Sequence, residues 1–308
     1  MPIVKTDVPM TYRLARDTAE EITCAYPVCR KRVLTATAFG REIEALSIGS
    51  GDRTVLFTAA HHANEWITAT VLLKFAEELS RAILEKGQVY GIPANLFEEN
   101  CQIFLVPMVD PDGVDLVTGG IAQGSIQWEQ AKRLSNNCPS IPFPNGWKAN
   151  LLGVDLNLQY PAGWLQAREI KFSQGYTRPG PRDYVGKAPL TQRESRALAD
   201  FTSYLDPALI LAYHTQGEQI YWKYDDIDVP GALALGQEFA RLSGYSLEKT
   251  PYASGFAGYK DWFIKVWRRP GFTIEAGLGE NPLPISQFDT IYAKNLGILT
   301  TAALGLPA

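Results

Sequence analysis

Three histidines are the first feature of this 308-residue sequence to suggest chemistry, because His61, His62 and His214 are its only residues of that type. Two lie in His61-His62-Ala-Asn-Glu65, between a short apolar run and a long amphipathic one. The spacing His62-x-x-Glu65 places an imidazole and a carboxylate on one side of a helical turn. Both groups bind Zn²⁺, and a catalytic zinc needs three protein ligands with one position left open. His214, after a separate apolar run, is the only distant histidine available as a third ligand.

The same residues also have a structural interpretation that needs no metal. The histidines could be polar residues at strand ends, and Glu65 could cap a helix. Taken alone, the His-x-x-Glu spacing does not separate the two interpretations. The elements and motifs around it therefore have to decide between them.

The spacing of apolar residues predicts strands that alternate with helices. A strand pair surrounds Gly40, and Thr191-x-x-Glu194 predicts a capping box that opens a helix. Asp110-Pro-Asp-Gly113 predicts a turn, and periodicity fades over 119–164. The predicted strands cover residues 33–39, 43–48, 54–59, 102–106, 209–213 and 271–274, and the predicted helices cover residues 14–26, 67–84, 191–204, 231–242 and 290–303.

Residues of catalytic type stand where predicted strands end, at His62, His214 and Glu275. Strands that alternate with helices predict an α/β fold, with a mixed, mainly parallel twisted sheet flanked by helices on both faces. In such folds the site lies beyond the strand ends. No internal repeat, low-complexity tract or linker divides the chain, so we expect a single domain over residues 1–308.

Composition and charge narrow the class of protein. Hydrophobic residues make up 46% and charged residues 20% of the chain, as in ordinary globular proteins. A net charge of −4 provides no basic field, so we expect neither a nucleic-acid nor a membrane partner. Without a signal-peptide pattern or an apolar run of membrane-spanning length, a cytoplasmic location is expected. The four cysteines lack CxxC spacing and are expected as reduced thiols, although a Cys24–Cys29 bridge stays open.

In its motifs the sequence resembles the zinc carboxypeptidase family of metallopeptidases, from about Tyr12 to Leu304. Five motifs occur in the family's order, and their agreement is more specific than any one of them. Asp110 stands where the family usually has Asn. The motifs are Phe57-Thr-Ala-Ala-His61-His62-Ala-Asn-Glu65, Asp110-Pro-Asp-Gly113, Gly153-Val-Asp155-Leu-Asn157, the strand that ends at His214, and Phe272-Thr273-Ile-Glu275.

The resemblance implies a zinc carboxypeptidase-like fold and one zinc ion per chain. The implied zinc ligands are His62, Glu65 and His214. Asp155 would orient His62 by accepting the other ring N–H of that histidine. The alternative is that Asp155 only caps a turn, because aspartate is common in turns.

The resemblance also implies that Glu275 is the general base. Zinc lowers the pKa of a water molecule, and a nearby carboxylate takes its proton and later returns it to the leaving amine. The alternative is that Glu275 is a buried carboxylate paired with an arginine such as Arg268 or Arg269.

Within the family, four segments are similar to bacterial γ-D-glutamyl-L-diamino acid endopeptidases, which cut peptidoglycan stem peptides. This likeness implies hydrolysis of the amide between D-glutamate, through its γ-carboxyl, and the L-centre of a diamino acid. The partner would be a stem peptide of the γ-D-Glu-diaminopimelate type. The LysM wall-binding repeats of some members are absent, which fits an intracellular enzyme acting on wall fragments. The segments are His61-His62-Ala-Asn-Glu65-Trp66-Ile-Thr68, Trp147-Lys148-Ala-Asn150, His214-Thr-Gln216-Gly-Glu218 and Gly277-Leu-Gly-Glu280-Asn-Pro-Leu-Pro284.

Two positions depart from the carboxypeptidase pattern. Asn157 is present, but Leu158 stands where carboxypeptidases have the arginine that clamps a C-terminal carboxylate. Leucine cannot make that contact, which disfavours an ordinary protein carboxypeptidase. Lys148 stands where the family has an arginine that polarises the scissile carbonyl, and it keeps the charge without the fork geometry. A solvated loop lysine is the alternative for Lys148.

Further residues are candidates for the substrate pocket. Tyr252 lies in a loop resembling the one that carries the family's substrate-binding tyrosine, and a packed loop aromatic is the alternative. Diaminopimelate has an extra amine and carboxylate, so its pocket needs charges of both signs. Ordinary surface charge is the alternative for each candidate. By their nearness to motifs, the candidates are Gln216, Glu218, Lys260 and Glu280.

Two other functions stay open from the sequence. A member of the family could be an amidase or deacylase that acts on other acyl-amino acids. A catalytically silent peptide-binding member of the fold is also open, although the three ligands together with Glu275 argue against it. Turnover that depends on zinc separates an enzyme from a binding module.

Overall fold

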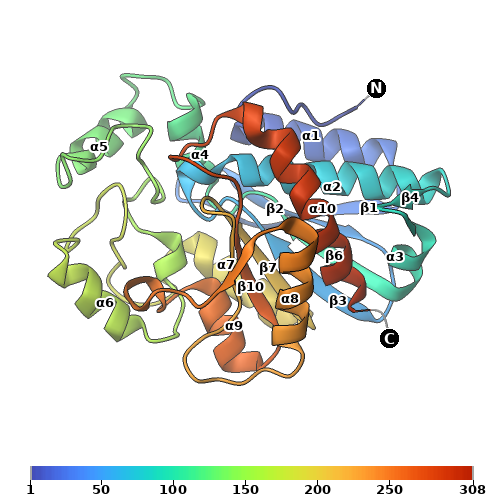
Figure 1. The fold of residues 1–308 in the computed structure, drawn as a ribbon. Helices are drawn as coiled ribbons and strands as arrows, with labels where there is room; N and C mark the ends of the chain where they lie inside the picture. Colours follow the sequence, from blue (N-terminus) through green and yellow to red (C-terminus); the bar gives the residue numbers. More distant parts are fainter. Residues whose placement is uncertain (1, 307–308) are drawn as a thin grey trace.

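The centre of the computed structural model, which describes residues 2–306, is an eight-stranded sheet with the order β1-β2-β6-β3-β7-β10-β8-β9 (Figure 1). The central strands β6, β3, β7 and β10 are parallel, and antiparallel pairs add β2 and β1 at one side and β8 at the other. The predicted mixed, mainly parallel sheet is therefore confirmed. The strands are β1 Cys29–Ala36, β2 Glu42–Ile48, β3 Arg53–Thr58, β6 Cys101–Val106, β7 Leu209–His214, β8 Gln219–Tyr221, β9 Ser246–Glu248 and β10 Gly271–Glu275, with a separate ribbon of β4 Gln88–Val89 and β5 Ile92–Pro93.

Helices cover both faces of the sheet, because its central strands are apolar on both faces. One layer holds α1 Tyr12–Ala25, α2 Ile67–Leu84, α8 Ala232–Ser243 and α10 Phe288–Leu304, and the other holds α7 Arg193–Leu205 and α9 Tyr259–Trp267 (Figure 1). In β10, Gly271 lies against Phe263 of α9, whereas the next residue, Phe272, packs on Phe239 of α8 with ring centroids 4.9 Å apart. Successive strand residues point to opposite faces, so α8 and α9 lie on opposite sides of the sheet.

A loop-rich segment follows α4 (Pro111–Thr118) and contains α5 (Ile126–Ser135) and α6 (Trp164–Ser173). Figure 1 shows α5 and α6, in green, on the side of the molecule away from both chain ends. The segment reaches the end of β3, since the Lys148 carbonyl accepts the Ala63 N–H at 3.2 Å. It therefore forms a wall beside the carboxyl ends of the central strands.

The prediction of a turn at Asp110 is wrong, and several short elements were not predicted. Asp110-Pro-Asp-Gly113 does not form an isolated turn but begins α4, because the Asp110 carboxylate accepts the Gly113 N–H at 3.0 Å and so caps the helix. The segment 119–164 is not wholly irregular, since it contains α5. Also unforeseen are α3 Asn95–Asn100, α6, α9, β8 and β9.

The capping box expected at Thr191 does not form. The Thr191 hydroxyl donates to the Gln159 side-chain oxygen at 2.9 Å, and the helix begins two residues later at Arg193. Glu194 accepts the Asn150 side-chain N–H at 3.2 Å, and the Thr191 N–H that a capping box would offer it donates to the Gln159 side-chain oxygen at 2.9 Å. Tertiary partners have replaced the local bonds that the sequence pattern predicts.

None of the helices within residues 2–306 is both long and apolar enough to cross a bilayer. The cytoplasmic location expected from the sequence stays a prediction. All four cysteines are free thiols, so Cys24 and Cys29 are not bridged.

Arg41 is an ion-pair centre that joins the β1–β2 connection to α4. Its Nε lies 2.8 Å from Asp115 Oδ2, and its Nη1 lies 2.8 Å from Asp112 Oδ1. Both carboxylates are buried, and Asp115 Oδ1 accepts the Tyr12 N–H at 2.8 Å. Since α4 packs against the 3-10 turn η1 (Ala63–Glu65), this ion-pair centre supports the turn on which two candidate ligands depend.

We expect Arg41→Met to lower the free energy of unfolding by about 3 kcal/mol, because it leaves two buried carboxylates without their cation. Urea denaturation followed by circular dichroism measures this change. Arg13→Met is the matched control, since Arg13 pairs with Asp17 on the exposed face of α1 and such pairs add little stability. Equal stability of the two variants would contradict the role given to Arg41.

Candidate metal centre and pocket

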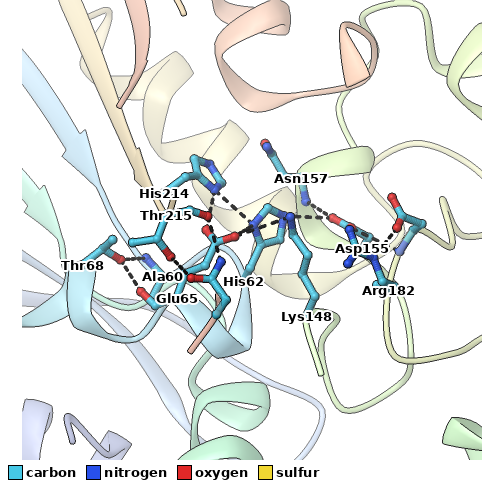
Figure 2. Close-up of polar contacts among 12 residues, drawn as sticks. Ala60, His62, Glu65, Thr68, Lys148, Asp155, Asn157, Arg182, His214 and Thr215 are labelled. Atoms are coloured by element: carbon cyan, nitrogen blue, oxygen red, sulfur yellow. Dashed lines mark hydrogen bonds and ion pairs between the residues drawn. The ribbon is translucent and has the colours of Figure 1, made fainter. Parts of the chain in front are cut away.

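The first two candidate ligands lie on the 3-10 turn η1, just past the end of β3. The Glu65 N–H donates to the His62 carbonyl at 3.1 Å. Residues three apart in such a turn lie on one side of it, so the two side chains point the same way (Figure 2). Thr68 fixes the turn, because its hydroxyl donates to the Glu65 carbonyl at 2.7 Å and accepts the Ala60 N–H at 2.9 Å.

The register of the parallel strands brings His214 and Glu275 alongside this turn. In the pairing of β7 with β10, Glu275 is the direct partner of His214. In the pairing of β3 with β7, Thr58 is matched with Ala212, so His214 extends beyond β3 towards His62. The register of the strands thus brings His214 close to His62, although the two residues are more than a hundred positions apart in the sequence.

Three ligand-type side chains converge at this edge of the sheet. His62 Nδ1 lies 2.9 Å from Glu65 Oε1, His214 Nδ1 lies 2.8 Å from Glu65 Oε2, and the two Nδ1 atoms are 3.0 Å apart. Ligand atoms around a tetrahedral zinc lie roughly 3.3 Å apart, given zinc–ligand distances of about 2.0 Å. Two imidazole nitrogens and a carboxylate at these separations fit such an ion.

The protonation states of the buried side chains in this cluster also bear on metal binding. Burial opposes ionisation of Glu65, yet His62 and Lys148 outweigh it and hold the pKa of this carboxyl well below its ordinary value. Burial lowers the pKa of His214 in spite of the nearby carboxylate. The cluster therefore presents an ionised carboxylate and one neutral imidazole, the forms that bind a metal, whereas Glu65 and Asp155 outweigh burial and raise the pKa of His62, so that ring has to release its proton when a metal binds.

Asp155 and Lys148 come from the loop-rich segment and flank the cluster (Figure 2). Asp155 caps the short turn η2 (Leu156–Leu158) and also lies 3.2 Å from His62 Nε2 through Oδ1, which leaves Nδ1 of that ring for the cluster. Lys148 Nζ lies 3.4 Å from Glu65 Oε1. Burial favours the neutral form of Lys148, but Glu65 and Asp155 outweigh it and raise its pKa, so the ammonium stays charged.

Glu275 and the cluster face a pocket with a volume of about 190 Å³. Removal from water raises the pKa of Glu275 to about 8, and the charge of Glu65 adds to this shift while Lys148 opposes it. Of the two arginines considered as partners of Glu275, Arg269 lies 2.9 Å from Asp206 and Arg268 is exposed.

The candidate substrate residues are divided between this pocket and other surfaces. Asn157 and Lys260 line the pocket. Tyr252 is 73% exposed, Gln216 is exposed, and Glu218 forms an ion pair with a lysine of α10. These three side chains do not line the pocket, and a role for them in substrate binding stays a prediction.

Several charged residues of the pocket carry no signal in the sequence. Lys171 lies on α6, whose apolar pattern is weak, Asp183 lies in the loop that follows this helix, and Asp261 lies on α9. Arg182 contacts Asp183 and stands close to Asp155 (Figure 2). No motif marks these positions, and only the fold brings them to one pocket.

The sequence profile of the zinc carboxypeptidases matches residues 16–296 of the chain. The protein belongs to this family. It is 40% identical over 287 residues to gamma-D-glutamyl-L-diamino acid endopeptidase 1 of Lysinibacillus sphaericus, covering 93% of this chain and 70% of that protein. It is 38% identical over 286 residues to the uncharacterized protein YqgT of Bacillus subtilis (strain 168), covering 92% and 74% of the two chains.

The fold agrees with this membership. The solved structure of thrombin activatable fibrinolysis inhibitor superposes with a TM-score of 0.76 over 99% of this chain and 78% of that chain, at 16% identity. As a zinc carboxypeptidase homologue with an endopeptidase among its relatives, the protein is a hydrolase. Zinc is the metal of the family, and the cluster offers a donor set that suits it.

We expect His214→Ala to lose its bound zinc, because His62 and Glu65 alone do not complete a three-ligand site. Elemental analysis of the purified protein measures the metal, with about one zinc per chain expected in the wild type. Glu275→Gln is the matched control, since it changes a neighbouring side chain and keeps all three ligands. Full zinc content in His214→Ala would show that the metal lies elsewhere.

Proposed function

We propose that the protein, acting as one catalytic domain, hydrolyses the γ-D-glutamyl–diamino acid amide bond of peptidoglycan stem peptides. The observation that carries this proposal is the pocket beside the cluster, which combines Leu158 with lysine and aspartate side chains. Leucine offers no cation to the terminal carboxylate of an ordinary peptide, whereas a diamino acid brings both an amine and a carboxylate to be bound. The likeness to a relative named for this bond supports the choice.

In this proposal His62, Glu65 and His214 hold one zinc ion. Bound there, zinc would act as a Lewis acid on the scissile carbonyl and make a water molecule more acidic. Asp155 keeps the ring of His62 in the required orientation through the contact to Nε2.

Glu275 is the proposed general base, which takes a proton from the attacking water and returns it to the leaving amine. Its raised pKa, about 8, suits a group that must accept and release a proton near neutral pH. A cation in the neighbouring cluster lowers this pKa, because a nearby positive charge favours the carboxylate. Glu275 would then be ionised, and ready to accept a proton, at neutral pH.

We expect the protein to release diaminopimelate from L-Ala-γ-D-Glu-diaminopimelate and to leave intact a conventional peptide that ends in a free Phe. Mass spectrometry of the products reads both reactions. The control is Glu275→Gln, which should keep its zinc without turnover, because an amide cannot accept the proton. The reverse preference would refute the proposal, and turnover confined to other acyl-amino acids would identify an amidase or deacylase.

Lys148 is proposed to share the negative charge that develops on the scissile carbonyl oxygen. Removing one such electrostatic donor typically costs on the order of a hundredfold or more in kcat. We therefore expect Lys148→Ala to bind zinc normally and to lose kcat more than it raises KM, while Lys148→Arg keeps much of the rate. Steady-state kinetics on the stem peptide measure both constants, and a wild-type kcat in Lys148→Ala would exclude the role.

A further inference from the structure

Lys171 is a buried cation of the pocket wall that the proposed chemistry does not use. It lies on α6, its side chain is 10% exposed, and its Nζ is 2.7 Å from Asp183 Oδ1. The other oxygen of Asp183 is already bound, since Arg182 Nε lies 2.6 Å from it. Two cations thus share the Asp183 carboxylate, and both also interact with the charge of Asp155.

Lys260, another lysine of the pocket, differs from Lys171 because three polar groups contact its ammonium. Its Nζ lies 2.7 Å from the Lys223 carbonyl, 3.2 Å from the Thr250 hydroxyl and 2.6 Å from Asp261 Oδ1. Two of these contacts are hydrogen bonds and the third is an ion pair, so three groups hold the ammonium of Lys260 in place. Within residues 2–306, the ion pair with Asp183 is the one such contact of the Lys171 ammonium, which therefore keeps N–H donors for a ligand in the pocket.

The packing of Leu158 helps to position the Lys171 ammonium at the pocket. Leu158 packs in a small apolar cluster with Trp164 and Ala167 of α6. Ala167 and Lys171 are four residues apart on that helix, so they share a face. Leu158 therefore packs against the face of α6 that carries Lys171. Both residues line the same pocket.

We propose that the Lys171 ammonium, positioned by Asp183 and by the packing of α6 on Leu158, is a carboxylate-binding subsite of this pocket. It selects substrates that present a free carboxylate near the scissile amide. Only the choice of stem peptide as the probe rests on the proposed function. A stem peptide offers two sources of this group, the α-carboxylate of D-glutamate and the carboxylates of the diamino acid, and the experiment separates them.

The test measures dissociation constants by calorimetry in the Glu275→Gln background, so that the peptide is not consumed. The probes are L-Ala-γ-D-Glu-diaminopimelate and two analogues, one amidated at the D-glutamate α-carboxylate and one at the diaminopimelate carboxylates. We expect Lys171→Met to weaken binding of the parent peptide on the order of 10- to 100-fold, the effect of losing a charge-assisted hydrogen bond. With the analogue that lacks the bound carboxylate, the same substitution should have little effect. Lys171→Arg should restore most of the affinity.

Lys74→Met is the matched control, since it removes a largely buried lysine of α2 that pairs with Glu77 at 3.0 Å and does not line the pocket. It should lower the melting temperature and show no preference between the acid and amidated peptides. Zinc content of each variant excludes an indirect effect through Asp155, whose Oδ2 accepts the Asp183 N–H at 3.3 Å.

Three results would refute the subsite. Lys171→Met could weaken the binding of all three peptides equally, or it could leave the binding of the parent peptide unchanged. The third is that no peptide with a free carboxylate binds at all. Failure of the proposed function gives a different result, because the protein with Glu275 intact then does not hydrolyse the stem peptide. Carboxylate-dependent binding with no hydrolysis keeps the subsite and discards the function. Hydrolysis of the stem peptide together with binding that does not depend on Lys171 keeps the proposed function and discards the subsite.

Discussion

A carboxylate without water must be surrounded by positive charge or by hydrogen-bond donors, and Glu65 is the buried carboxylate on which this site depends. Its oxygens face His62 and His214, with Lys148 at 3.4 Å. Each of these neighbours comes from a different part of the chain: a turn, a strand end and a long loop. The charge of Glu65 is therefore compensated only when the sheet and the loop-rich segment have both folded.

Asp155 ties this cluster to the pocket wall. One oxygen lies against the ring of His62, and the other accepts the backbone N–H of Asp183. Burial opposes its ionisation, but His62, Lys148 and Lys171 outweigh burial and keep the pKa of Asp155 far below its ordinary value. The orientation of a proposed metal ligand and the position of the pocket wall are thus held by the two oxygens of one side chain.

The sequence predicted the elements whose signal is local. Buried strands, the helix over Ile67–Leu84 and the strand-end positions of His62, His214 and Glu275 follow from apolar runs that end at polar residues. The sequence could not predict the capping of α7, because Gln159, distant in sequence, takes the Thr191 hydroxyl. It also missed β8 and β9, which are three residues long, and the charged wall around Lys171, which exists only once α6 packs on the pocket.

The apolar side chain at 158 constrains how this pocket can evolve. Leu158 is 8% exposed and shares a packed cluster with Ala167, one helical turn from Lys171. An arginine at 158 would disrupt that cluster and crowd a second cation towards Lys171, and like charges held in a buried site repel. Loss of Lys171 alone would leave the wall without its free ammonium donors. On the proposed role of Lys171, replacing this way of binding a carboxylate by an arginine at 158 would therefore require substitutions at both 158 and 171.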